Sequence, residues 1–143
     1  SGSVAIIGNN IELTVSAGGD YDSWAGPSGY NLSQGPAGDD DGDGLTNFDE
    51  YAFGLDPTNP SSVASSTPPD KATESFSYTR RNLALTDLVY TYEYSTALDG
   101  WLPFDALIEE TDNGMPVETI TVTLPADLLA EPSLFLHVKA SIP

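Results

Sequence analysis

The stretch DDDGDGLTNFDE, residues 39–50, carries the most specific pattern in the chain. It fits the calcium loop D-x-[DN]-x-[DN]-G-x5-E at every fixed position. Calcium takes roughly six to eight oxygen ligands in a flexible geometry, and a loop with this spacing supplies them. The predicted ligands are the side chains of Asp39, Asp41, Asp43 and Glu50, the backbone carbonyl of Leu45, and Asn47, either directly or through a water.

The alternative interpretation of residues 39–50 is an acidic turn exposed to solvent. Six of the twelve residues are acidic. Like charges 4 Å apart repel by about 1 kcal/mol per pair even at the dielectric constant of water, and a bound cation removes that penalty. Magnesium fits less well than calcium, because it prefers octahedral sites that keep several waters.

A short helix is predicted to leave the loop over residues 46–53. Gly54 is placed to end this helix in the left-handed conformation, with Leu55 as its apolar contact and Pro57 as a stop.

Ahead of the loop, Asp20 is expected to cap a turn that carries Tyr21 and Trp24. Trp24 is expected to pack against Phe48 and Tyr51.

The run YDSWAGPSGYNL…DDDGDGLTNFDEYAFGLDP resembles the single calcium loop found near the C-termini of many secreted bacterial proteins. It is also similar to one half of a dockerin and to thrombospondin type 3 repeats. Dockerins carry two such loops and this chain has one, so the cohesin-binding function of dockerins is not carried over. The pattern VYTYEYSTALDGW resembles the β-domain that follows the calcium unit in those secreted proteins. The resemblance covers residues 21–143 and leaves the N-terminal segment outside.

Composition narrows the classes of partner. The chain has 143 residues, with 4 basic and 22 acidic side chains and a net charge of −18. Such a surface repels nucleic acid and anionic membranes, because binding phosphate needs lysine and arginine. No stretch is long and apolar enough to predict a membrane span. With no cysteine, disulfides and thiolate metal sites are excluded.

A lone calcium loop predicts an extracellular location. Such a site is expected to bind weakly, and weak sites fill where calcium is about millimolar, outside the cell. No signal peptide is visible, so the chain is expected to be a mature or excised form.

Residues 73–143 show the two-residue alternation of half-buried strands. Asp112-Asn113-Gly114 is typical of a hairpin turn. Strands are predicted at about 74–81, 87–95, 104–110, 115–124 and 133–141.

The expected fold is mainly β: a small β-sandwich with an N-terminal strand and a short helix–calcium loop–helix unit. The expected divisions are an N-terminal strand and glycine joint (1–19), the calcium unit (20–56), a Pro/Ser/Thr linker (57–72) and the β-sandwich-like domain (73–143).

Residues 4–16 form an apolar segment ahead of a Gly-Gly joint. They predict either a hairpin that turns at residues 8–10 or one long strand. Ile7, Ile11, Leu13 and Val15 share one face and are expected to be buried against a sheet edge of the same chain or of a neighbour. Donation to a neighbour would assemble copies of the chain head-to-tail into a fibre.

The aromatic residues leave a second kind of partner open. Tyr90 and Tyr92 share a strand face, and Trp101 follows a turn. The favoured interpretation is that they form core. If exposed, they would offer a platform for sugar rings, and the chain would be an ancillary polysaccharide-binding or spacer module of a larger secreted enzyme.

Catalysis by the chain itself has little support, since the one histidine, His137, lies in a predicted strand. A non-enzymatic structural module is the favoured expectation.

Overall fold

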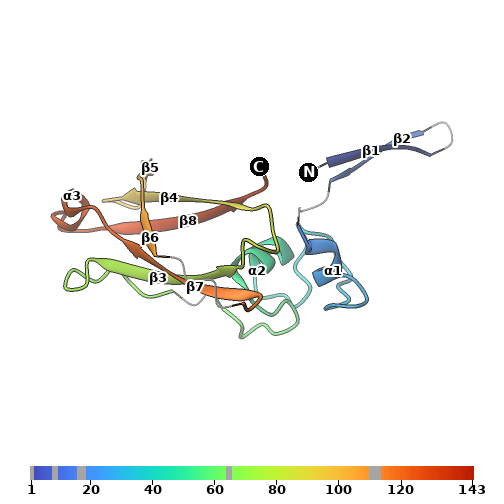
Figure 1. Cartoon of the computed structure of the whole chain (residues 1–143), viewed down its shortest axis with the longest axis horizontal. Helices are drawn as coiled ribbons and strands as arrows, with labels where there is room; N and C mark the ends of the chain where they lie inside the picture. The colour runs from blue at the N-terminus through green and yellow to red at the C-terminus, as the bar shows by residue number, and fades with distance from the viewer. Residues whose placement is uncertain (1, 8–9, 16–18, 64–65, 110–113) are drawn as a thin grey trace.

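The computed structural model describes residues 2–7, 10–15, 19–63, 66–109 and 114–143, with the backbone alone for the first two segments. These residues are mainly β, in antiparallel sheets with short helices (Figure 1). The strands are β1 (Gly2–Ile7), β2 (Asn10–Val15), β3 (Ser75–Arg81), β4 (Val89–Ser95), β5 (Leu102–Pro103), β6 (Leu107–Glu109), β7 (Val117–Thr123) and β8 (Phe135–Ser141). The helices are α1 (Tyr21–Ala25), α2 (Asn47–Phe53) and α3 (Ala126–Leu129). Among the described residues, no helix is long and apolar enough to cross a membrane.

The N-terminal segment is a hairpin. β1 and β2 pair antiparallel, from Gly2 opposite Val15 to Ile7 opposite Asn10, and form a two-stranded sheet of their own. The prediction of a hairpin is therefore confirmed, and the alternative of one long strand is wrong. The side chains named for strand donation, those of Ile7, Ile11, Leu13 and Val15, lie outside what the structure describes, so their burial stays a prediction.

The remaining strands form two three-stranded antiparallel sheets, in the orders β3-β7-β6 and β5-β4-β8. The strands predicted at 74–81, 87–95, 115–124 and 133–141 are confirmed to within two residues. The strand predicted at 104–110 is present but shorter, as β6, and it pairs antiparallel with β7 as the predicted hairpin requires. Just before it, β5 pairs with β4 in the other sheet, so the chain changes sheets between the two strands. Pro103 has no N–H with which to continue the ladder. In the predicted hairpin turn, residues 112 and 113 lie outside the described part of the chain.

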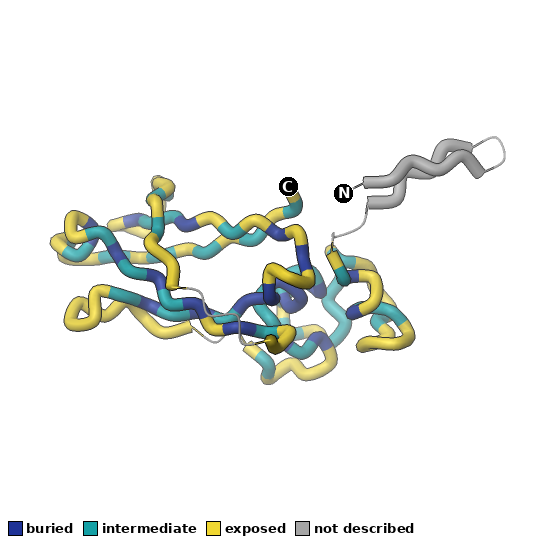
Figure 2. The backbone as a smooth tube through the Cα atoms, in the orientation of Figure 1, coloured by how far each residue is buried: buried dark blue, intermediate teal, exposed yellow. Residues whose placement is uncertain are grey.

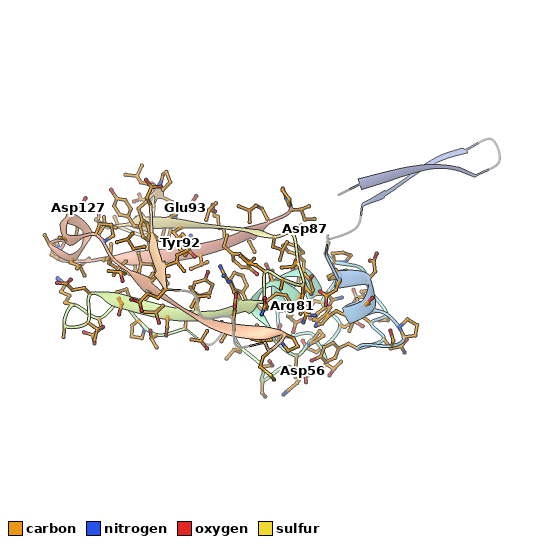
Figure 3. The ribbon with its side chains drawn as sticks, viewed as in Figure 1. Asp56, Arg81, Asp87, Tyr92, Glu93 and Asp127 are labelled. Atoms are coloured by element: carbon orange, nitrogen blue, oxygen red, sulfur yellow. The ribbon has the colours of Figure 1, made fainter. Side chains whose placement is uncertain are left out.

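One hydrophobic core takes side chains from both three-stranded sheets. Phe76 and Tyr78 of β3, Ile120 and Val122 of β7, and Tyr92 of β4 are buried in a single cluster. The hydroxyls of Tyr78 and Tyr92 are 2.8 Å apart and hydrogen-bond across it. Figure 2 shows buried positions alternating with less buried ones along β3 and β7, and Figure 3 shows Tyr92 between the sheets. The period-two pattern in the sequence therefore predicted the buried face correctly.

A second cluster joins α1 and α2. The rings of Tyr21, Trp24 and Tyr51 lie 5.1–5.5 Å from one another, in tilted or edge-on arrangements that suit aromatic pairs. Phe48 packs against the same cluster, partly buried. The predicted packing of Trp24 is thus confirmed.

Asp20 precedes α1, but its side chain makes no capping hydrogen bond, so the predicted cap is wrong. Its carboxylate instead accepts the Tyr51 hydroxyl at 2.8 Å and forms an ion pair with Arg81 of β3. A hydrogen bond between two charged groups is stronger than one between a carboxylate and a neutral backbone N–H, which explains the preference for Arg81.

Candidate metal centre

Three aspartates come together in the loop. Asp39, Asp41 and Asp43 each place a carboxylate oxygen within 4.8 Å of the other two, so the cluster could hold a metal ion. Asp39 accepts the backbone N–H groups of Gly42 at 2.6 Å and Gly44 at 2.9 Å, which folds the loop back over its first residue. Gly44 has a φ of 98°, where a side chain would be strained, as expected for the residue at the sharp turn.

Asp41 and Asp43 each use only one carboxylate oxygen within the protein. Oδ1 of Asp41 accepts the N–H of Asp43 at 3.1 Å, and Oδ1 of Asp43 accepts the N–H of Leu45 at 2.7 Å. The second oxygen of each, Oδ2, is buried without a hydrogen-bond partner. These two oxygens have no partner within the described part of the protein and could contact a cation held by the three aspartates.

Glu50 is the most informative residue of the group. Its side chain is 0% exposed, and neither carboxylate oxygen has a hydrogen-bond partner. Burial, together with repulsion from Asp41, Asp43 and Asp39, raises the pKa of Glu50 to about 7. The oxygens that lie within 4.8 Å of one another belong to the three aspartates, and Glu50 is not in that group. A buried carboxylate without a hydrogen-bond partner is costly to ionise, which agrees with the raised pKa.

Helix α2 fixes the position of Glu50. Thr46 and Asp49 form a capping box: the Thr46 hydroxyl accepts the N–H of Asp49, and the Asp49 carboxylate accepts the N–H of Thr46. Gly54 ends the helix with a φ of 72°, and the N–H of Leu55 returns to the carbonyl of Glu50 at 2.8 Å. The predicted helix and its glycine end are confirmed. Asp49 is thereby used in the cap, outside the ligand set.

The side chain of Asn47 ties residues 34–40 to the start of α2. Its amide Nδ2 donates to the carbonyls of Gln34 and Gly35 and to Asp40, and its Oδ1 accepts the N–H of Asp40 at 3.2 Å. The ligand role of Asn47, directly or through a water, stays a prediction, as does that of the Leu45 carbonyl.

Asp40 has a structural role that the sequence reasoning missed. Its carboxylate accepts the backbone N–H of Ser33 at 2.7 Å, the Ser33 hydroxyl at 2.9 Å and the N–H of Gln34 at 3.0 Å. These bonds, with that from Asn47, lower the pKa of Asp40 to about 2. The loop motif allows any residue at this position, so it gave no signal for this role.

The far end of α2 is bonded to both three-stranded sheets. A helix leaves its last carbonyls without partners inside the helix. Here the carbonyl of Ala52 accepts the Tyr90 hydroxyl of β4 at 2.6 Å, and that of Phe53 accepts the Thr79 hydroxyl of β3 at 2.9 Å. Arg81, labelled in Figure 3, places its guanidinium 5.2 Å from the centre of the Tyr51 ring. The loop and the sheets are therefore joined through one short helix.

The segment between α1 and the loop is not helical. α1 ends at Ala25, and turns and bends occupy much of the chain between it and Asp39. The first part of the unit thus departs from a regular pair of helices flanking a loop.

The residues named for a sugar platform are not brought together. Tyr92 is 6% exposed, and Tyr90 is partly buried against both clusters. Trp101 lies apart from them and stacks on His137 of β8, with ring centroids 3.5 Å apart and planes at 12°. The two tyrosines therefore contribute to the core clusters, and both Tyr90 and Trp101 keep part of their surface in solvent.

Comparison of the chain with protein-family models, with curated proteins and with solved structures finds no match. The resemblance to the calcium units of secreted bacterial proteins accordingly rests on the loop and strand motifs alone.

Proposed function

We propose that this chain is a calcium-stabilised, non-enzymatic structural module of an extracellular protein. The observation that carries the proposal is a set of buried carboxylate oxygens without partners: Oδ2 of Asp41, Oδ2 of Asp43 and both oxygens of Glu50. The ion would be held by Asp39, Asp41, Asp43 and Glu50, with the Leu45 carbonyl as a further oxygen. An all-oxygen, carboxylate-rich set that includes a two-oxygen glutamate suits calcium better than magnesium.

The proposed role is structural because of what the site is attached to. An ion that holds Glu50 against the aspartates fixes the middle of α2, and the end of α2 is bonded to β3 and β4 through Thr79 and Tyr90. Ordering the loop would thus stabilise the contact between the calcium unit and the sheets. We further propose that the two three-stranded sheets form a small β-sandwich around the core shared by Tyr78 and Tyr92, with a helix–calcium loop–helix unit packed at one end.

Calorimetric titration with calcium tests the proposal. We expect one ion per chain and, at pH 6.5, release of more than half a proton, because Glu50 has a pKa of about 7 without the ion and must ionise to bind it. Affinity should therefore rise between pH 6 and 8. The proton count follows from titrations in two buffers of different ionisation enthalpy. Binding of one ion with no proton release would contradict the assigned role of Glu50, and no binding at millimolar calcium would contradict the proposal.

A second proposal concerns partners. We propose that the module associates with copies of itself, and the observation in favour is that β1 and β2 form a separate two-stranded sheet. A two-stranded hairpin is marginally stable by itself in water and gains stability from a further sheet. The alternative partner, a polysaccharide, has less support, because of the three aromatic residues named for it two lie in the core clusters.

A further inference from the structure

β8 is an edge strand with little protection. Among the described residues its seven residues pair with β4 alone. A hollow of about 840 Å³ lies beside it, lined both by Leu136 and Val138, which face the core, and by Phe135 and His137, which face outward. Lining from both faces means that the hollow runs around the free edge of the strand. An exposed edge offers a row of unpaired N–H and C=O groups to another strand.

The opposite wall of the hollow is already covered. Phe76 and Tyr78 of β3 line it, and residues 66–69 lie along the outer edge of β3. The N–H of Thr67 donates to the carbonyl of Ser77 at 2.9 Å, and the N–H of Ser77 donates to the Thr67 hydroxyl at 2.8 Å. Part of the expected 57–72 linker therefore covers the edge of β3, and the edge of β8 has no such cover among the described residues.

The N-terminal hairpin has the properties of a partner for this edge. β8 contains Lys139 and no acidic residue, and Lys139 forms an ion pair with Glu93 of β4 at 2.8 Å. The segment 2–15 contains Glu12 and no basic residue, so Glu12 could share Lys139 with Glu93. Their lengths also match, since β1 and β2 have six residues each and β8 has seven. Within one copy, the hairpin and the β5-β4-β8 sheet stay separate.

We propose that the free edge of β8 accepts the β1–β2 hairpin of a second copy of this chain, which extends the three-stranded sheet to five strands. Each copy would give its hairpin and receive another at β8, so the contact is head-to-tail and adds copies in a row. This inference rests on the self-association proposed above, and it identifies the β8 edge as the surface through which the copies associate. Leu45 and Asp49 of the loop also line the hollow, but the carboxylates proposed as calcium ligands, those of Asp39, Asp41, Asp43 and Glu50, do not.

Hydrogen exchange on the full chain, at low and high protein concentration, tests the proposal alongside sedimentation. In an edge strand alternate N–H groups lack partners, so alternate amides in residues 135–141 should exchange fast in the single copy and slowly in the assembly. Association without this protection would overturn the β8 assignment and leave self-association intact. A chain that stays a single copy at every concentration would overturn both, whereas calcium titration would be unaffected.

Charge reversal gives the matched variants. Lys139→Glu replaces the positive charge of β8 with a negative one, which Glu12 of the hairpin would oppose, and it should weaken association about tenfold, since cross-strand charge pairs contribute up to about 1 kcal/mol and like charges oppose pairing. Adding Glu12→Lys to the same chain should restore association. Lys71→Glu makes the same change in net charge away from β8, where the Lys71 amine donates to the carbonyl of Glu131. Equal weakening by Lys71→Glu, or no rescue by Glu12→Lys, would overturn the proposal. Lys139→Glu also breaks the surface ion pair with Glu93, so melting curves are needed to check that each variant is folded.

Discussion

Glu50→Gln is expected to stabilise the calcium-free protein at pH 8 and to abolish most of its affinity for calcium. Without the ion, the Glu50 carboxylate is buried without partners beside three aspartates, and its pKa rises from 4.5 to about 7. A shift of that size corresponds to roughly 3 kcal/mol of lost stability when the group is ionised. Glutamine has nearly the same shape and no charge, so it removes this penalty.

Part of the gain is offset because the glutamine amide is itself buried without partners, at about 1–3 kcal/mol. We therefore expect a net stabilisation of about 1 kcal/mol in chelator. In the presence of calcium, Glu50→Gln is expected to make the protein less stable than the wild type. The variant loses one negative charge and a two-oxygen ligand, so its affinity should fall on the order of a hundredfold.

Urea unfolding of both proteins, in chelator and in calcium, measures the two effects. Glu109→Gln is the matched control, because it makes the same chemical change at an exposed residue of β6. It should leave the stability unchanged both in chelator and in calcium. If Glu50→Gln destabilises the protein equally with and without calcium, the carboxylate is an ordinary structural group and the site assignment is wrong.

Removal of calcium should lower the stability of the wild-type protein substantially. With free calcium at ~100 times the dissociation constant, binding to the folded state alone contributes about 2.7 kcal/mol. For a chain of this size that corresponds to a fall in melting temperature of about 10 °C. Thermal unfolding in calcium and in excess chelator measures it.

The stabilisation of the wild-type protein by calcium should depend on pH, because calcium binding requires Glu50 to be ionised. Its pKa is raised in the folded calcium-free state, so the stability associated with its protonated form is full below about pH 4.5 and is lost as pH rises through about 7. Calcium must displace that proton to bind. The calcium-dependent gain in stability should therefore be small at pH 5 and large at pH 8. A gain that is equal at both pH values would contradict this linkage.

The sequence predicted those parts of the molecule that depend on local spacing. The loop positions of Asp39, Asp41, Asp43 and Glu50 follow from one motif, and the alternation in residues 73–143 identified the buried faces of β3 and β7. The left-handed end of α2 at Gly54 was likewise predictable, because few other residues adopt that conformation without strain.

The predictions that failed depended on partners far along the chain. Asp20 looks like a helix cap by its position, but Arg81, 61 residues away, binds its carboxylate in an ion pair. The bonds of the Asn47 amide to residues 34–40 were likewise not marked by the loop motif. The strand predicted at 104–110 is shorter than expected, at Leu107–Glu109, and no local pattern marks the change of sheet between β5 and β6 that precedes it.

The most direct test of the calcium site is a crystal structure of the protein grown with calcium. We expect one ion bound by Asp39, Asp41 and Asp43 and by both carboxylate oxygens of Glu50, at calcium–oxygen distances of about 2.3–2.6 Å. The side chain of Asn47 should keep its bonds to residues 34–40. A structure in which this position holds no ion, and in which the Glu50 carboxylate is hydrogen-bonded within the protein, would contradict the account.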